Sequence, residues 1–268
     1  MSEVRAGLSR LNGLGSSDPT RNKRDIDPLS RKNMSMRPTL LIALAVFTSL
    51  VLLGADNGEL GGKEKPDGWK ALFNGKDLKG WRLYKSQAPP GSGWKAEDGI
   101  VKKMAGIRGG DIITEEQFGD FELSWEWRIS PEGNNGVKYL VTESRTSAPG
   151  PEYQMIDDDR HPDGKFGPKR QTASLYDILP PTKDRPIKPV GEWNTSGVII
   201  RGSHVEHWLN GAKVLEYELG GEALKQGIAL SKFKKVSGFG DKIKGHIMLT
   251  DHGDECSFRN MKIREISH

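Results

Sequence analysis

The sequence of 268 residues contains a single cysteine, Cys256, so no disulfide can form within the chain. Disulfide-stabilised scaffolds are thereby excluded. Cys256 stands in a strand-like run, Cys256-Ser257-Phe258, and no activating residue lies near it in the sequence. We therefore expect a buried thiol at this position rather than a catalytic nucleophile.

The chain also lacks an excess of one charge outside its first segment. Residues 1–55 carry eight Lys/Arg and four Asp/Glu, and subtracting these from the totals of 40 and 36 leaves 32 of each. Proteins that bind nucleic acid normally present a clustered basic face. The formally neutral remainder therefore argues against a nucleic-acid partner.

Long hydrophobic runs are absent except for Leu40–Leu53, which has 14 residues. About 20 apolar residues are needed to cross a bilayer as a helix. Arg37 precedes the run and Gly54-Ala55 follows it, an arrangement typical of a signal peptide. We predict a signal peptide over 34–55 that is cleaved after Ala55; an uncleaved anchor is the alternative.

This prediction places the protein in the periplasm or outside a bacterial cell, with no membrane span after cleavage. Residues 1–33 are polar and aperiodic, which indicates a disordered extension or a start site assigned too early. Residues 56–68 are typical of a flexible linker.

From Trp69 onward the sequence shows short strands separated by turn residues, and there are 33 glycines in all. Phe121–Ile129 alternates apolar and polar side chains, which predicts a half-buried antiparallel strand. Asn134-Asn135-Gly136 is expected to turn the chain into Val137–Val141. Gly221–Gln226 is a short helix candidate. We predict that residues 69–268 form one all-β domain, a two-sheet antiparallel jelly-roll sandwich.

Two hairpins are expected between 198 and 219, the second through Asn210-Gly211. Pairing across the turns assigns each side chain to one of two faces. The core face is predicted to hold Val198, Ile200, Val205, His207, Leu209, Ala212 and Val214. The other face is predicted to hold Ile199, Arg201, His204, Glu206, Trp208, Lys213 and Tyr217.

Nine strings that follow one another through residues 69–266 resemble the 3-keto-disaccharide hydrolase family. They are Leu72–Leu78 with Gly80-Trp81, Trp94–Gly99, Gly119–Leu123, Gly133–Gly136, Glu152–Asp158, Gly191–Asn194, His207–Gly211, Asp251–Asp254 and Phe258–Arg264. The resemblance implies a concanavalin-like sandwich, exported in many bacteria. It also implies hydrolysis of glycosides whose sugar has been oxidised to a 3-ketone.

Glu152 and Gln154 share one strand face because side chains alternate along a strand. We expect them to converge with His252 on one sheet, which makes Glu152 and His252 the predicted catalytic residues and Gln154 a substrate-binding residue. A 3-ketone acidifies the proton at C2, so a general base and an electrophile at the carbonyl would permit elimination followed by addition of water. Either Glu152 or His252 could be that base.

Two alternatives to this chemistry remain open. Glu152 could pair with Asp157 or Asp158 as in ordinary glycosidases, which use two carboxylates. The domain could also be a non-catalytic carbohydrate-binding module, since sandwiches of this kind serve both roles.

Five further positions are predicted to bind substrate, with packing or turn roles as the alternative. They are Asn135, Tyr176, Asn194, His207 and Trp208. The loop after Glu152 is rich in oxygen ligands, and Asp157, Asp158 and His161 are predicted to hold one divalent metal ion that would polarise the ketone. The alternative is a solvated acidic loop. Ser231–Lys244 is expected to be a loop that is either solvated or closes over the groove.

Overall fold

The computed structural model describes residues 67–145 and 147–267, which lie in one compact unit. The predicted extension 1–33 and the predicted signal peptide 34–55 lie outside the described residues, as does most of the predicted linker. No helix within the described ranges has the length and apolar character needed to cross a membrane.

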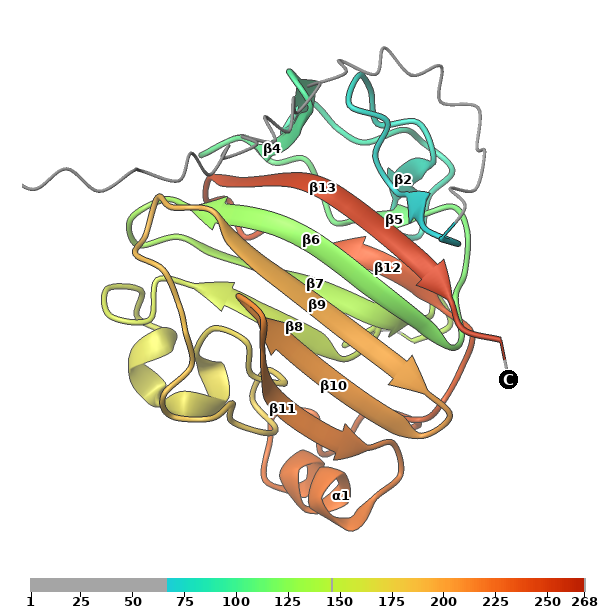
Figure 1. Ribbon diagram of the computed structural model, residues 1–268, viewed down its shortest axis with the longest axis vertical. Helices are drawn as coiled ribbons and strands as arrows, with labels where there is room; N and C mark the ends of the chain where they lie inside the picture. Colours follow the sequence, from blue (N-terminus) through green and yellow to red (C-terminus); the bar gives the residue numbers. More distant parts are fainter. Residues whose placement is uncertain (1–66, 146, 268) are drawn as a thin grey trace, which may run out of the picture. The chain divides into compact units, whose positions relative to one another are not determined.

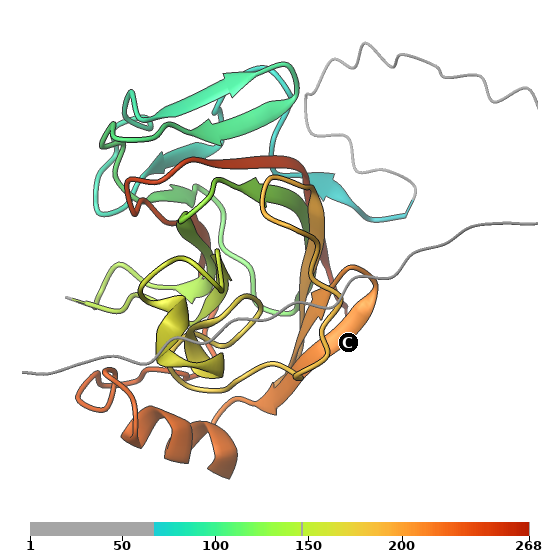
Figure 2. The same cartoon turned by 90° about the vertical axis from the view of Figure 1, so that its left-hand side faces the viewer.

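Two antiparallel sheets pack face to face, which confirms the predicted sandwich (Figure 1). The larger sheet has the strand order β11-β10-β9-β6-β13-β4-β3, with β1 also paired to β13. The smaller sheet has the order β2-β5-β12-β7-β8. The two layers, with α1 beyond their edge, are seen edge-on in Figure 2.

The larger sheet is built from the following strands: β1 (Lys70–Ala71), β3 (Trp94–Glu97), β4 (Ile100–Lys103), β6 (Phe121–Ile129), β9 (Asn194–Arg201), β10 (His204–Leu209), β11 (Ala212–Glu218) and β13 (Cys256–Glu265). The smaller sheet contains β2 (Trp81–Leu83), β5 (Ile112–Thr114), β7 (Asn134–Val141), β8 (Glu152–Ile156) and β12 (His246–Leu249). The helical elements are η1 (Gly164–Phe166), η2 (Pro168–Arg170) and α1 (Glu222–Ala229).

The alternation predicted for Phe121–Ile129 is confirmed in β6, whose odd-numbered side chains are buried between the sheets. Trp125 and Trp127 are among the largest of them, and both indole N–H groups find partners inside, on Met155 Sδ and Ser196 Oγ. Cys256 is also fully buried, as expected, and burial raises the pKa of its thiol. The core therefore lies between the two sheets.

One predicted turn is wrong. Asn134-Asn135-Gly136 is the start of strand β7, and the chain turns earlier, at Ser130–Gly133, where Gly133 N–H donates to the Ser130 carbonyl at 3.0 Å. Glu132 takes a positive φ of 60° in that turn. Pairing with β8 keeps Asn134–Gly136 extended, because Gly136 lies opposite Gln154 in the ladder.

A second correction concerns Tyr217, which was expected on the outer face with Lys213. A register shift between His207 and Trp208 in the β10–β11 ladder changes the alternation, so that both Val214 and Tyr217 are buried. The turn before it is as predicted: Asn210 and Gly211 both have positive φ, at 47° and 85°. The helix candidate is confirmed but starts and ends later, at Glu222 and Ala229.

Candidate functional site

A pocket of about 460 Å³ lies over strands β7 and β8. Tyr139 and Tyr153 of these strands point inward and contact His207 of the opposite sheet, so alternate residues point the other way, into the pocket. The lining residues are Asp111, Asn134, Lys138, Ser147, Ala148, Pro149, Glu152, Gln154, Tyr176, Lys232, Phe233, Val236 and His252. The pocket therefore lies on the outer face of the smaller sheet.

Glu152, Gln154 and His252 all line this pocket, as the strand alternation predicted. The Glu152 carboxylate lies 3.3 Å from Lys138 Nζ and 3.9 Å from His252 Nε2. Its side chain is 7% exposed, whereas that of His252 is 41% exposed. A bound molecule would therefore meet His252 at the surface of the pocket and Glu152 beneath it.

The electrostatics of the pocket keep Glu152 ionised. Burial by itself opposes the charge, but Lys138 and His252 outweigh it and hold the pKa of Glu152 at about 2. The β7–β8 ladder places Lys138 directly opposite Glu152, which explains the close pair. Lys138 was not identified as a site residue from the sequence. Its place next to the inward-facing Val137 was the available signal, because neighbouring side chains on a strand point to opposite faces.

Tyr176 forms part of the pocket wall together with Lys232. Its hydroxyl donates to Asp163 Oδ2 at 2.5 Å and accepts from Lys232 Nζ at 3.1 Å. Burial and the Asp163 carboxylate raise the pKa of Tyr176. Lys232, Phe233 and Val236 all belong to the predicted loop Ser231–Lys244, so this loop forms one side of the pocket.

The other predicted substrate-binding residues do not line the pocket. Asn135 is fully buried because it points inward from β7, and its amide donates to the Thr250 carbonyl. Asn194 is also buried and accepts from Lys188 N–H in the turn before β9. Their side chains hold neighbouring chain segments together.

His207 and Trp208 are adjacent on β10 and therefore point to opposite sides of the larger sheet. His207 is fully buried between the sheets, where it contacts Tyr139 Oη at 2.8 Å. Trp208 lies on the outer face of the larger sheet, and its indole N–H donates to Glu206 at 2.8 Å. Neither side chain faces the pocket, which lies on the other outer face of the sandwich.

The predicted metal ligands do not fit a metal site. Both Asp157 oxygens accept backbone N–H groups, from Glu132 and from Asp159 and Arg160. Asp158 accepts from Thr172 N–H and pairs with Arg185, and His161 Nδ1 accepts from Asp163 N–H. These atoms organise the loop itself.

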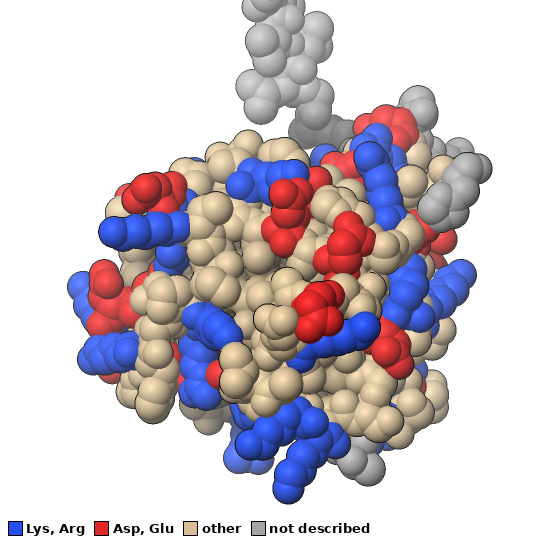
Figure 3. Space-filling view, turned by 90° about the horizontal axis from the view of Figure 1, so that it is seen from below, with Lys and Arg blue, Asp and Glu red and all other residues tan. Residues whose placement is uncertain are grey.

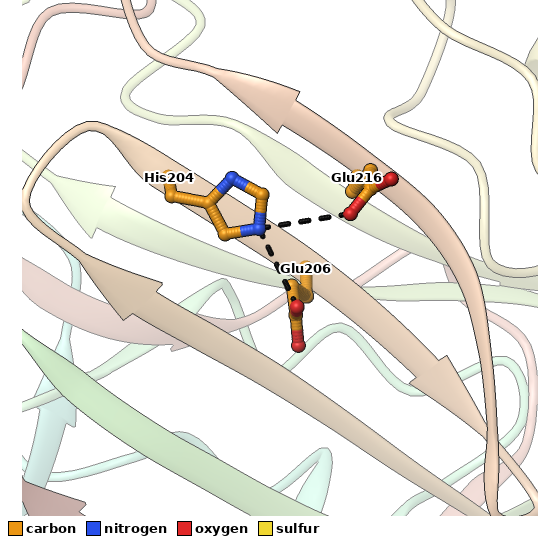
Figure 4. Close-up of side chains that lie close together, drawn as sticks. All are labelled: His204, Glu206 and Glu216. Carbon is orange, nitrogen blue, oxygen red and sulfur yellow. Dashed lines mark hydrogen bonds and ion pairs between the residues drawn. The ribbon is translucent and has the colours of Figure 1, made fainter.

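Metal-ligand spacing does occur elsewhere in the part of the chain that the structure describes. His204, Glu206 and Glu216 each offer a ligand atom within 4.8 Å of the others, and Figure 4 shows them converging from β10 and β11. Lys213 Nζ already lies 3.3 Å from Glu206 and 2.6 Å from Glu216, so its charge competes with any cation there. This group is on the outer face of the larger sheet, away from the pocket.

A larger hollow of about 560 Å³ opens beside β2, among Lys76, Arg82, Pro89 and Glu115. It contains none of the predicted site residues and no histidine. Figure 3 shows the molecule from below relative to Figure 1, and on that face basic and acidic side chains are interspersed. The pocket over β7 and β8 is therefore the better candidate site, because it combines a buried carboxylate, two lysines and an accessible histidine.

Comparison with known proteins shows the family and agrees with the fold. Residues 68–264 match the family described as the 3-keto-alpha-glucoside-1,2-lyase-like domain. A 3-keto-disaccharide hydrolase of Bacteroides thetaiotaomicron is 34% identical over 252 residues, which are 82% of this chain and 86% of that protein.

Two solved structures from Parabacteroides distasonis, both of candidate glycosyl hydrolases, are similar. The first is 34% identical with a TM-score of 0.68, covering 76% of this chain and 96% of its own. The second is 27% identical with a TM-score of 0.56, and the match covers 74% of this chain and 99% of the other. These relatives favour an enzyme over a non-catalytic binding module. The chain therefore belongs to the 3-keto-alpha-glucoside-1,2-lyase-like family, and it is a glycoside hydrolase-like enzyme.

Proposed function

We propose that the chain releases the leaving group from glycosides whose sugar carries a 3-ketone, using the pocket over β7 and β8. The observation that carries the proposal is the Lys138–Glu152–His252 arrangement. The Glu152 carboxylate lies 3.3 Å from Lys138 Nζ and 3.9 Å from His252 Nε2. The named activity of the relative from Bacteroides thetaiotaomicron supports the same substrate class.

The geometry favours His252 as the general base. A carboxylate with a pKa near 2 is a weak proton acceptor at neutral pH, so Glu152 is poorly suited to remove the C2 proton. The His252 side chain is exposed to the pocket, and histidine is the side chain that most often serves as a general base. Glu152 would stabilise the imidazolium that His252 becomes, as a carboxylate does beside a catalytic histidine.

The proposed reaction proceeds by elimination and addition. His252 takes the proton from C2, and the electron pair moves onto the ketone oxygen as an enolate. The enolate then expels the leaving group from C1, and the departing oxygen takes the proton held by His252. Water adds to the resulting unsaturated ketone, so that the net reaction is hydrolysis. Asp157 and Asp158 do not line the pocket, so the pairs considered for a two-carboxylate mechanism are absent from it.

We also propose that the protein is exported, as the sequence of residues 34–55 predicts. Export would bring the pocket to oxidised glycosides outside the cytoplasm. A metal requirement is a separate prediction, and no step above depends on one.

The test uses residues 56–268 with an aryl 3-keto-glucoside and its unoxidised parent. We expect turnover of the oxidised substrate alone. His252→Ala should lower kcat by about 10²- to 10⁴-fold, the usual contribution of a general base. His204→Ala is the matched control, because this histidine lies on the opposite outer face.

Wild-type rates in His252→Ala would exclude the proposed base. Equal cleavage of the unoxidised glucoside would instead show an ordinary glycosidase. An EDTA arm tests the metal prediction: turnover lost to the chelator and restored by a divalent ion would show that a metal is required.

A further inference from the structure

Gln154 is a buried pocket residue whose amide is only half satisfied. The residue is 1% exposed, and its Nε2 donates to Asn134 Oδ1 at 3.2 Å. Its Oε1 is buried and has no hydrogen-bond partner among the residues that the structure describes. Buried polar atoms are almost always paired in proteins, so an unpaired one in a pocket wall points to a ligand.

The position of Gln154 relative to Glu152 suits a sugar ring. The two residues are separated by one inward-facing residue, Tyr153, so their Cα atoms lie about 7 Å apart along the strand. Gly136 lies opposite Gln154 in the ladder and adds no side chain between them. A single ring in the pocket could therefore contact both residues through different substituents.

The chemistry of an amide oxygen limits what it can bind. Oε1 can only accept a hydrogen bond, so it pairs with a hydroxyl and not with a ketone oxygen. The cations of the pocket, Lys138 and Lys232, can only donate, which suits the ketone and the enolate formed from it. The pocket thus offers an amide oxygen that can accept from a hydroxyl and two cationic donors that suit the ketone of the same sugar.

We propose that Gln154 Oε1 accepts a hydrogen bond from one intact hydroxyl of the bound sugar and so selects substrates that carry this hydroxyl. Asn134 is the positioning residue, because it holds Nε2 and leaves Oε1 for the ligand. The inference rests on the sugar-processing role proposed above. It adds that the enzyme recognises an unoxidised position of the sugar as well as its ketone.

The test is a double-change cycle, in which one residue of the protein and one hydroxyl of the substrate are removed separately and together. The kcat/KM of the wild type and of Gln154→Met is measured on an aryl 3-keto-glucoside and on its 2-deoxy, 4-deoxy and 6-deoxy analogues. We expect the kcat/KM of the wild type to be about 10- to 100-fold lower on one analogue than on the parent substrate, the range for a buried polar group left unpaired. The kcat/KM of Gln154→Met on the parent substrate should be lower than that of the wild type by a similar factor. Its kcat/KM on that analogue should be no lower than on the parent.

Gln171→Met is the matched control, since Gln171 does not line the pocket and donates to the Gly164 carbonyl. It should keep the wild-type discrimination. Melting temperatures show whether each variant is folded. Equal losses for Gln154→Met on the parent and on every analogue would overturn the inference, because a structural role moves all substrates together.

A failure of the proposed function gives a different result. If the wild type turns over no 3-keto-glycoside, the same cycle is measured by calorimetric binding of the unoxidised aryl glucoside and its 2-, 3-, 4- and 6-deoxy analogues. Loss of affinity for one analogue in the wild type, absent in Gln154→Met, would support the inference even then. Identical affinities across the series would reject it.

Discussion

Gly136 shows how one missing side chain shapes the candidate site. A Cβ at this position would overlap the Glu152 carboxylate, whose Oε1 and Cδ atoms lie over the Gly136 backbone. The carboxylate can therefore cross β7 and reach Lys138 and His252 only because residue 136 is glycine. The requirement is one of close approach, since Gly136 lies in an ordinary strand.

We predict that Gly136→Ala displaces the Glu152 carboxylate and lowers kcat by about 10- to 100-fold, the scale of a small misplacement at a catalytic site. Steady-state kinetics on the aryl 3-keto-glucoside measure the effect. Gly119→Ala is the control, because a Cβ at Gly119 would meet nothing within 4 Å. Full activity in Gly136→Ala would show that the carboxylate position is not needed.

His207 is a buried histidine with a single possible neutral form. Its Nδ1 lies 3.0 Å from the Ala173 carbonyl, which can only accept, so Nδ1 carries the proton. Nε2 then accepts from the Tyr139 hydroxyl at 2.8 Å, and that hydroxyl accepts from Tyr217 at 2.6 Å. Burial lowers the pKa of His207 to about 4.

The protein should therefore lose stability in mild acid. The folded pKa of His207, about 4, lies below the ordinary value of 6.5, so between these values the unfolded chain binds a proton that the folded chain does not. The free energy of unfolding should fall by roughly 3 kcal/mol as the pH drops from 6.5 to 4. Urea titrations measure it, and His207→Gln should flatten this part of the curve. An unchanged slope in the variant would assign the effect to other groups.

At the scale of elements, one buried ion pair ties the loop that carries His252 to the end of β4. Lys103 Nζ lies 2.8 Å from Asp251, and the two side chains are 0% and 6% exposed. The other Asp251 oxygen accepts N–H groups from Gly109 and Gly110 at 2.6 and 2.8 Å. Loops far apart in the sequence are thus fixed next to the site.

Breaking this pair should cost more than breaking one at the surface. We predict that Lys103→Met lowers the free energy of unfolding by about 3–5 kcal/mol, because it leaves a buried carboxylate unpaired. Lys213→Met removes an exposed pair with Glu216 and should cost no more than about 1 kcal/mol. Chemical denaturation of both variants gives the comparison. Equal losses would mean that burial of the Lys103 pair adds nothing.

The prediction of elements from sequence worked where alternation was long and uninterrupted. Strand β6 matches its predicted range because nine residues alternate without a break. The prediction failed at Tyr217, because the register shift beside His207 depends on the neighbouring strand and leaves no signal in the local sequence. It also failed at Asn134–Gly136, where pairing with β8 overrides a turn-like composition.

At the scale of the whole molecule, the export proposed above would link the function of the first residues to that of the domain. We predict that the protein isolated from the cells that make it begins at Asp56, after removal of residues 34–55 with everything before them. Mass spectrometry of the intact protein and N-terminal sequencing check this. A protein that keeps the Leu40–Leu53 segment and sediments with membranes would instead support an uncleaved anchor.

The sequence by itself determined the two-sheet sandwich, the family, and the shared face of Glu152 and Gln154, because each follows from local alternation or from an ordered series of motifs. Tertiary structure alone decided which sheet face carries the pocket and which residues meet there. It put Asn135 in the interior, Lys138 beside Glu152, and the pocket on the outer face away from Trp208. These outcomes depend on pairing and packing between segments distant in the chain, and no local pattern encodes such contacts.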